Sequence, residues 1–338
     1  MDCKTEISAP HIGNTDTDQH SDMLACLRVQ NIPFRINEPL GRHCTWRIGG
    51  PTDLLAEPQS VAQVALLIRR ARDLKMPFVV IGKGSNLLFN DSGLRGLVIK
   101  IDRGLSRISI NGRTVTAQAG IAMPRLAHRL GRAGLGGLEH TVGIPGNLGG
   151  LVVMNGGSLR QNIGDVITSV TYVDEDGNLQ TRGQVDCDFS YRNSWFLHHA
   201  GWIVEVSLEL LPKPAAELMP VMLDILRTRR KHFPLQYPNC GSVFKNSDRL
   251  FRAVGPPGRA IESLGLKGRR NGGLEISARH ANFFINRDQG TCRDALGLID
   301  QVSGLAARHL GCGLEAEVRY VDSQGRIQPA HLANLSAR

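Results

Sequence analysis

The feature that most limits how this chain can fold is a glycine-rich segment at residues 143–157. It reads Gly-Ile-Pro-Gly-Asn-Leu-Gly-Gly and, three residues later, Met-Asn-Gly-Gly. Glycine loses more backbone freedom on folding than any other residue, so a run this dense is costly in a regular element. That cost is tolerated where the main chain must pass close to another group, such as a pyrophosphate. A loop-rich segment without a ligand is the alternative interpretation.

A shorter glycine cluster, Gly-Lys-Gly-Ser-Asn-Leu at residues 82–87, directly follows an apolar run that is expected to form a strand. Consecutive backbone N–H groups in such a turn can bind an anion, and Ser85 and Asn86 add side-chain donors. The cluster is not a dinucleotide fingerprint, because Leu87 stands where that pattern requires glycine, and it lacks the ending of a P-loop. It therefore indicates a phosphate contact without naming a cofactor, and a plain glycine turn is the alternative.

Strands and helices are mixed along the chain in a pattern typical of an α+β fold. Apolar residues recur at helical spacing from Ser60, a good N-cap, to Lys75, and the last long helix should end before Gly311. The Pro-Lys-Pro run at 212–214 predicts a domain boundary. The expected elements are helices at 60–75, 124–133, 217–231 and 293–310, strands at 78–81 and 97–99, and hairpins at 108–117 and 166–179.

The composition is that of an ordinary globular protein, with 338 residues, 41% hydrophobic and 21% charged. No apolar run approaches the roughly 20 residues of a membrane span, and the polar residues 1–33 predict a variable or partly disordered tail rather than a secretory signal. Seven scattered cysteines fit a reducing cytoplasm and indicate no metal site. The net charge of +9 suits polyanionic small molecules. Because no basic run carries interleaved aromatics, we expect no nucleic acid partner.

The two glycine clusters belong to a longer, ordered set of motifs. The others are Thr-Trp-Arg-Ile-Gly-Gly at 45–50, Phe-Ser-Tyr-Arg-Asn-Ser at 189–194, Tyr-Pro-Asn-Cys-Gly-Ser-Val-Phe-Lys-Asn at 237–246, His-Ala-Asn-Phe at 280–283 and Leu-Glu-Ala-Glu-Val at 314–318. In this order, over residues 34–322, the motifs resemble the UDP-N-acetylenolpyruvoylglucosamine reductase family, in its subclass lacking an extra tyrosine loop. The resemblance implies a vanillyl-alcohol-oxidase (PCMH-type) fold, with FAD-binding subdomains at 34–101 and 102–212 and a C-terminal α+β substrate-binding domain at 213–338.

The resemblance also implies the cofactor and the reaction. Non-covalently bound FAD would be reduced by NADPH as co-substrate and would then reduce the enolpyruvyl ether of a UDP-sugar in peptidoglycan precursor synthesis. We expect a cytoplasmic monomer without membrane insertion. The residues implied to contact FAD are Gly82, Lys83, Gly84, Ser85, Asn86 and Leu87 on the phosphate side, and Gly143, Ile144, Gly146 and Gly149 on the flavin side, together with Asn155.

Three residues match the family's catalytic positions. Arg192 would bind the substrate carboxylate, because a guanidinium is always charged and can fork onto two oxygens. Glu317 would orient the arginine or, if protonated, donate to the enolate that hydride addition creates. Ser242 would protonate the enolate carbon, helped by a neighbouring cation such as Lys245. Cys240 is a rival acid, since a thiol is more acidic than a hydroxyl.

From the residues alone each position has a simpler interpretation: a surface salt bridge for Arg192, a solvated strand residue for Glu317 and a turn serine for Ser242. Glu315 alternates onto the same face of the expected strand, so only the motif separates it from Glu317. The rival functions are an FAD-dependent oxidase of the same fold and a non-catalytic nucleotide-binding module. The three residues together argue against both. Alcohol oxidation needs a base rather than groups that bind and protonate an enolate, and a non-catalytic module would not be expected to retain all three catalytic positions.

Further residues are candidates for substrate contact. Basic side chains close the helix expected at 217–231, where they suit its dipole in any case. They can also bind the diphosphate of the UDP-sugar or the phosphates of NADPH. The family often has serine at Asn239 and proline at Ser247, and these departures remove no catalytic group. The substrate-binding candidates are Tyr191, Arg230, Lys231, Lys245 and Asn246.

Overall fold

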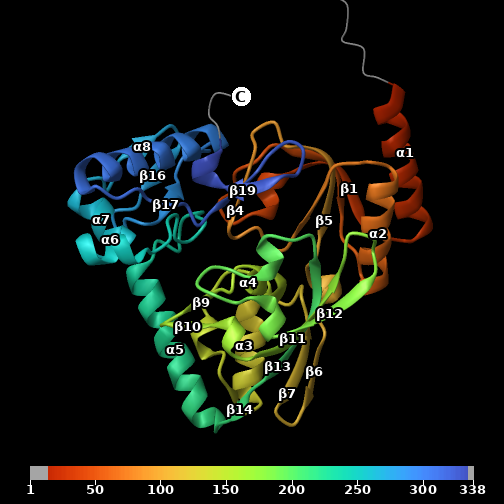
Figure 1. Cartoon of the computed structure of the whole chain (residues 1–338), viewed down its shortest axis with the longest axis horizontal. Helices are drawn as coiled ribbons and strands as arrows, with labels where there is room; N and C mark the ends of the chain where they lie inside the picture. The colour runs from red at the N-terminus through yellow and green to blue at the C-terminus, as the bar shows by residue number, and fades with distance from the viewer. Residues whose placement is uncertain (1–13, 334–338) are drawn as a thin grey trace, which may run out of the picture.

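The first apolar segments of the chain pair into a four-stranded sheet. The strands are β1 (Phe34–Pro39), β2 (Pro51–Ala56), β3 (Phe78–Ile81) and β5 (Leu94–Lys100), in the order β1-β2-β5-β3. Helix α2 (Val61–Asp73) packs against this sheet, and the Ser60 side chain caps it by accepting a hydrogen bond from Gln63 N, as predicted. The computed structural model describes residues 14–333, and this first subdomain lies at the upper right of Figure 1.

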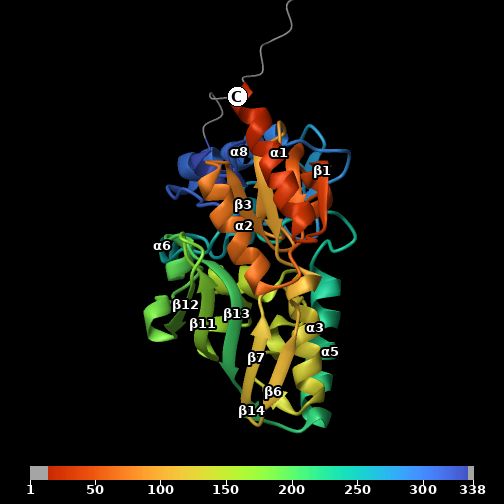
Figure 2. The ribbon, with the colours of Figure 1, turned by 90° about the vertical axis from the view of Figure 1, so that its right-hand side faces the viewer.

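The second sheet is antiparallel throughout and lies below the first (Figure 2). Its strands are β6 (Ile108–Asn111), β7 (Thr114–Gln118), β11 (Ile167–Val173), β12 (Leu179–Gly183) and β13 (Trp202–Glu209), in the order β12-β11-β13-β7-β6. Both predicted hairpins are confirmed, because β6 pairs with β7 and β11 pairs with β12. Helices α3 (Met123–Arg132) and α4 (Leu148–Val153) accompany this sheet, and α3 has proline in its first turn, where the missing N–H costs nothing.

The remaining residues form a mainly helical part, whose hydrophobic core also takes in Trp46, Ile48 and Leu88 of the first subdomain. It holds α5 (Ala215–His232), α6 (Asp248–Ala253), α7 (Pro257–Ser263), α8 (Cys292–Leu310) and a small sheet of β15 (Arg270–Asn271), β16 (Leu274–Ile276) and β17 (Phe284–Asn286). The helices predicted at 217–231 and 293–310 are confirmed, and α8 ends at Gly311, whose φ of +65° is the left-handed conformation that glycine adopts freely. Four two-residue strands complete the second subdomain: β8 (Leu135–Gly136), β9 (Gly157–Ser158), β10 (Gln161–Asn162) and β14 (Leu211–Pro212).

The end of the chain returns to the first subdomain. Strand β18 (Arg319–Val321) pairs in parallel with β4 (Leu87–Phe89), which directly follows the first glycine cluster, and β19 (Ile327–Pro329) pairs with β18. In addition, the long helix α5 packs along α3 of the second subdomain. The C-terminal part is therefore attached to both subdomains, and the division at residue 213 stays a prediction.

The N-terminal segment differs from the expected tail. Residues Asn14–Val29 form helix α1, and Met23 and Leu27 are fully buried against the first subdomain. The apolar residues of this helix are few, so the polar composition hid the two that supply the contact. Residues 1–13, also assigned to the tail, lie outside the described residues.

Candidate active site

A cavity of about 760 Å³ lies between the turn that carries Arg192 and helix α7. All three residues expected in catalysis line it: Arg192, Ser242 and Glu317. They come from the second subdomain, the loop after α5 and the segment before β18. The fold thus brings together three side chains that are far apart in the sequence.

Arg192 and Glu317 form an ion pair in the wall of this cavity. The Arg192 Nε and Glu317 Oε1 atoms are 2.6 Å apart, although the N–H is not aimed well enough to count as a hydrogen bond. Both side chains are mostly buried, with 19% and 15% of their surfaces exposed. The salt bridge that the simpler interpretation placed on the surface therefore belongs to the cavity.

The turn that presents Arg192 is strained and firmly held. Arg192 has a φ of +53°, which is uncommon for a residue with a side chain, and the turn is closed by backbone hydrogen bonds between Ser190 and Asn193. Asn155 Nδ2 donates to Ser190 O at 2.9 Å, and the Ser194 hydroxyl donates to Val153 O at 2.7 Å. Such strain persists where surrounding contacts determine the conformation, as is common at functional sites.

Burial shifts the proton affinity of Glu317. Removal from water raises the pKa of its carboxyl group above the ordinary range, against the opposing effect of Arg192 and Lys245. A raised pKa favours the protonated form, which can donate a hydrogen bond. Glu317 lies just before β18 rather than within the expected strand, since its neighbour Ala316 makes only an isolated bridge to Phe244. Glu315, the competing carboxylate, is exposed.

Ser242 is better placed as an acid than Cys240. Ser242 lines the cavity, whereas Cys240 is buried in the C-terminal core with 5% of its surface exposed. Burial also raises the pKa of the Cys240 thiol far above its usual range, so it holds its proton tightly. Gly241, between the two, has a φ of +80° that lets the loop turn the serine outward.

The two glycine clusters lie against each other where the first and second subdomains meet. A Cβ atom on Gly146 would lie 3.2 Å from Ser85 Oγ, and one on Gly82 would lie 3.3 Å from the Asn147 side chain. Asn147 Nδ2 donates to Ile101 O, while its buried Oδ1 has no hydrogen-bond partner among the described residues. Close-packed loops with an unused buried acceptor fit a bound dinucleotide.

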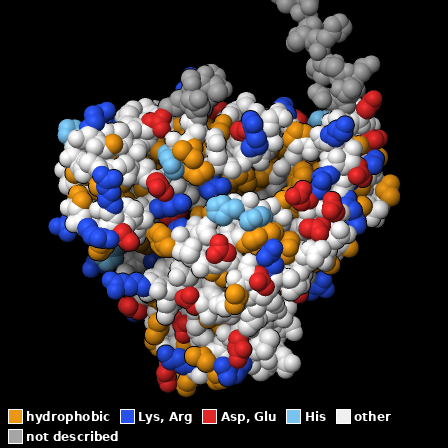
Figure 3. Space-filling model, in the orientation of Figure 1, with side chains coloured by type: hydrophobic (Ala, Val, Ile, Leu, Met, Phe, Trp, Pro, Cys, Tyr) orange, Lys and Arg blue, Asp and Glu red, His pale blue; other side chains and the backbone are white. Residues whose placement is uncertain are grey.

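The first cluster is also joined to the catalytic residues. Asn86 Nδ2 donates to the carbonyl oxygen of Glu317 at 3.1 Å. Figure 3 shows a hollow on this face between the upper and lower parts of the molecule, with hydrophobic, Lys/Arg and His side chains around it. The expected phosphate-binding turn and the acid of the cavity are therefore held in one unit.

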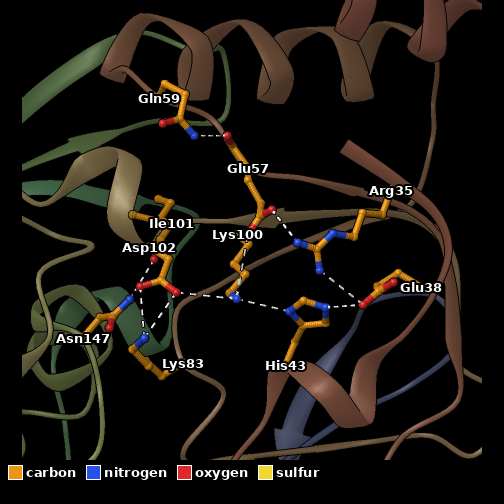
Figure 4. Close-up of polar contacts among 10 residues, drawn as sticks. All are labelled: Arg35, Glu38, His43, Glu57, Gln59, Lys83, Lys100, Ile101, Asp102 and Asn147. Carbon is orange, nitrogen blue, oxygen red and sulfur yellow. Dashed lines mark hydrogen bonds and ion pairs between the residues drawn. The ribbon is translucent and has the colours of Figure 1, made fainter. Parts of the chain in front are cut away.

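A chain of polar side chains supports Lys83 of the first cluster (Figure 4). Lys83 Nζ is 3.3 Å from an oxygen of Asp102, and Lys100 Nζ is 3.5 Å from the same carboxyl group. The Lys100 ammonium also lies 3.1 Å from His43 Nδ1, which must accept, so His43 Nε2 carries the proton and donates to Glu38 at 2.9 Å. Burial lowers the pKa of His43, which keeps the ring neutral.

The other candidate residues divide into two groups. Tyr191 and Asn246 line the cavity, and the Tyr191 hydroxyl accepts a hydrogen bond from Asn246 N at 3.2 Å. Arg230, Lys231 and Lys245 do not line it, although Lys245 is close enough to lower the pKa of Glu317. Their contacts with a substrate stay predictions.

Asn155 uses its side chain on the protein itself. Its Nδ2 donates to Ser190 O, its Oδ1 accepts from Gly164 N, and the residue is buried. These contacts give it a role in holding the Arg192 turn, and its expected contact with FAD stays a prediction.

The sequence reasoning missed several cationic residues of the cavity. Arg259, Lys267 and Arg279 line it, and Arg279 also donates to the carbonyl oxygens of Arg230 and Phe233. These residues are scattered over separate loops and helices without a shared local pattern. Only their tertiary arrangement brings them to one wall, where Lys267 pairs with Glu262 of the same wall and the two arginines suit an anionic ligand.

The fold and the site define an FAD-binding reductase with a separate C-terminal domain. Residues 52–183 match the family described as FAD binding domain, and residues 233–321 match the UDP-N-acetylenolpyruvoylglucosamine reductase C-terminal domain. The chain is 44% identical over 282 residues to the UDP-N-acetylenolpyruvoylglucosamine reductase of Moorella thermoacetica, covering 83% of this chain and 91% of that protein. It is 41% identical over 286 residues to reductase 1 of Corynebacterium glutamicum, covering 85% of each.

A solved structure agrees with these relatives. The UDP-N-acetylenolpyruvylglucosamine reductase of Thermus caldophilus superposes with a TM-score of 0.71 at 30% identity, covering 86% of this chain and 98% of that one. The chain belongs to the UDP-N-acetylenolpyruvoylglucosamine reductase family. The predicted family, the α+β FAD-binding fold with its C-terminal domain and the FAD cofactor are thereby confirmed. No helix among residues 14–333 is both long and apolar enough to cross a membrane.

Proposed function

We propose that this protein uses NADPH to reduce the enolpyruvyl ether of UDP-N-acetylglucosamine, giving UDP-N-acetylmuramate for peptidoglycan precursor synthesis. The observation that carries the proposal is the convergence of Arg192, Ser242 and Glu317 on one cavity beside the glycine clusters. The relatives named above act on the same substrate by their names, and they match this chain over more than four-fifths of its length.

The reaction assigns a role to each of the three side chains. Bound FAD supplies hydride transfer from NADPH to the outer carbon of the enol ether. Arg192 binds the substrate carboxylate, onto which the negative charge of the enolate spreads. Glu317 orients the arginine as a carboxylate or, in the acid form that its raised pKa favours, donates to the developing charge. Ser242 then gives its proton to the enolate carbon, and the wall cations stabilise the anionic product.

Other parts of the proposal concern binding and location. FAD contacts residues 82–87 on the phosphate side and Gly143, Ile144, Gly146 and Gly149 on the flavin side, together with Asn155. Tyr191, Arg230, Lys231, Lys245 and Asn246 contact the UDP-sugar or NADPH. The protein acts as a monomer in the cytoplasm, where NADPH is formed and where buried free thiols such as Cys187 and Cys312 stay reduced.

A substitution of Arg192 tests the catalytic assignment. Arg192→Lys keeps the positive charge but cannot fork onto a carboxylate, so turnover should fall by at least about 10-fold while FAD binding is retained. Steady-state oxidation of NADPH and the absorbance of bound FAD measure the two quantities. Turnover within a factor of about two of wild type would contradict the carboxylate role. Oxidase activity on sugars without NADPH would instead favour the rival function.

A further inference from the structure

The C-terminal half of the chain places an unpaired cation on the glycine loop of the FAD-binding domain. Arg229, in the last turn of α5, extends over Gly143, and a Cβ atom added to Gly143 would lie 2.5 Å from Arg229 Nε and closer still to Cδ. Gly143 has an ordinary φ, so the turn itself does not require glycine there. The arginine side chain occupies the space where a Cβ atom would be, so a larger residue at Gly143 would displace it.

The packing of α5 fixes this arrangement. Val142, the neighbour of Gly143, is buried in a small core with Met222 of α5 and Ala127 of α3. The other end of the Arg229 side chain lies against Phe233, with the guanidinium carbon 4.9 Å from the ring centroid. Phe233 in turn contacts His280, which lines the cavity. Arg229 thus lies between the cofactor loop and the cavity wall.

The charge of Arg229 has no partner among the described residues. No carboxylate forms an ion pair with it, no hydrogen bond joins any of its nitrogens to another described residue, and its Nε is buried. Burial alone lowers the pKa of the guanidinium, and no acid opposes that effect. The guanidinium lies against the Phe233 face, and its terminal nitrogens, unlike Nε, are not buried and are open to a further partner. An anion that is not part of the protein would complete the site.

We propose that Arg229 binds an anionic part of FAD, and so acts as a cofactor-binding residue supplied by the C-terminal half of the chain. This inference rests on the proposed function, since it requires the protein to hold FAD. FAD is the favoured source of the anion because Arg229 lies on Gly143, inside the FAD-binding family match, and does not line the cavity. The anionic part is the diphosphate or the charge at the reduced flavin ring, and both are recognised by a guanidinium.

The proposal also changes the interpretation of the basic end of α5. Arg230 and Lys231 are exposed and point to no described acceptor, whereas Arg229 is the member of this group that reaches a functional loop. Bound FAD that contacts Arg229 would therefore add a second link between α5 and the second subdomain, beside the packing of α5 on α3.

The test is a comparison of FAD binding to apoprotein of wild type, Arg229→Met, Arg229→Lys and Arg132→Met. Arg132 is an exposed cation at the end of α3, so its variant removes one charge without touching either loop. Quenching of FAD fluorescence gives Kd, and reduction in the presence of a reference dye gives the midpoint potential. We expect Arg229→Met to raise Kd about 10- to 100-fold, as for loss of a charged hydrogen bond, with Arg229→Lys intermediate and Arg132→Met unchanged.

The two measurements, Kd and midpoint potential, distinguish between the two anionic parts of FAD. A higher Kd with an unchanged potential places Arg229 on the diphosphate, and a lower potential places it at the flavin ring, since a nearby cation stabilises the reduced form. Kd and potential both equal to wild type, within a factor of about two in Kd, would overturn the proposal. Should Arg229→Met fail to fold, Arg229→Gln keeps a polar side chain without charge and gives the same comparison.

A second measurement uses the contact with Gly143. Gly143→Ala should displace Arg229 in the wild-type background, so its effect on Kd should be clearly smaller in the Arg229→Met background. Equal effects in both backgrounds would count against the proposal. Wild-type protein that binds no FAD would overturn the proposed function together with this inference. The Arg229 role alone would be overturned if wild-type protein binds FAD and turns over, and Arg229→Met has the same Kd for FAD and the same midpoint potential.

Discussion

At the scale of single residues, burial separates groups that the sequence presents as equals. Ser242 and Cys240 are two positions apart in one loop, yet only Ser242 lines the cavity. Cys240 lies in the core, where the raised pKa of its thiol makes proton release costly. The weaker acid in free solution is thus the better placed one, and an exposed hydroxyl beside a basic carbon can serve as the donor.

This difference predicts opposite outcomes for two alanine variants. Ser242→Ala should slow oxidation of the reduced enzyme by the enolpyruvyl substrate about 100- to 10,000-fold, the usual contribution of a general acid. Reduction by NADPH should stay close to wild type, because that step takes no proton from the serine. Cys240→Ala should leave both steps nearly unchanged. Stopped-flow absorbance of the bound flavin measures each step.

The assignment of Ser242 as the proton donor fails if the substitution affects the NADPH half-reaction instead of the substrate half-reaction. A slower NADPH step with an unaltered second step in Ser242→Ala would exclude the serine as the proton donor. A larger loss in Cys240→Ala would transfer the role to the thiol. Ser242→Cys is the informative companion, because a thiol in the same place can also donate and should retain part of the activity.

Glu317 should make the stability of the apoprotein depend on pH. Its pKa is raised in the folded protein, so above the ordinary carboxyl range the native state still holds a proton that the unfolded chain has released. Stability must then fall as the pH rises from the unfolded pKa, about 4.3, through the higher folded pKa. Glu317→Gln cannot ionise and should lack this loss.

Thermal unfolding of both apoproteins between about pH 4 and pH 8 tests the sign. The difference in Tm, Glu317→Gln minus wild type, should shift in favour of the variant as the pH rises. A shift in favour of wild type would mean that the carboxylate form is the stabilised one, held by Arg192. In that case Glu317 orients the arginine and is not a donor.

The sequence predicted three catalytic residues but not the geometry that brings them to one cavity. The roles of Arg192, Ser242 and Glu317 came from the family motifs, since the residues themselves allowed a salt bridge, a turn and a solvated strand. The left-handed turn at Arg192 depends on Asn155, which is far from it in the chain. Arg229 was one of several basic residues near a helix end, and only its position over Gly143 distinguishes it.

At the scale of elements, local signals predicted most helices and hairpins because they rest on neighbouring residues. Ser60 caps α2 and Gly311 ends α8 through contacts within a few positions. Helix α1 was missed for a physical reason as well. Its stability comes from Met23 and Leu27 packing on the first subdomain, and an isolated polar helix of this length has little stability of its own.

The docking of α1 predicts a strong effect of one substitution. Leu27→Ala should lower the free energy of unfolding by about 2–5 kcal/mol, because Leu27 is fully buried and its removal leaves a cavity. Val29→Ala is the matched control, since Val29 is 76% exposed and should change stability by less than about 0.5 kcal/mol. Urea unfolding followed by circular dichroism measures both. Equal effects of the two variants would contradict the docking of α1.

At the scale of the whole molecule, the contacts between segments far apart in the sequence could not be predicted from the sequence. The pairing of β4 with β18 connects segments that are far apart in the sequence, and no local pattern specifies which strand a short apolar run will join. The same join brings Asn86 to the carbonyl of Glu317, and so couples the cofactor turn to the cavity. The family motifs predict that both segments are functional, and the tertiary fold places them next to each other.

A second long-range contact joins Asp91, in the turn that follows β4, to the start of α8. The Asp91 carboxylate accepts hydrogen bonds from Cys292 N at 2.7 Å and Arg293 N at 3.0 Å. These N–H groups belong to the first turn of the helix, where the dipole also favours a negative charge. Thr291 and Asp294 supply a separate capping box from within the helix itself. One cap thus links two parts of the molecule, and the other is local.

The two caps predict different consequences when each is removed. Asp91→Ala should destabilise the protein by about 0.5–2 kcal/mol, the usual cost of losing a helix cap, since two backbone donors lose a charged acceptor. It should also speed amide hydrogen exchange at Asn90 and Arg319, which belong to the β4–β18 join. Thr291→Ala should speed exchange in the first turn of α8 and leave that join unchanged. Unaltered exchange at Arg319 in Asp91→Ala would show that β4 and β18 hold together without the cap. Faster exchange there, with weaker FAD binding, would show that one carboxylate between the parts maintains the coupling of the cofactor turn to Glu317.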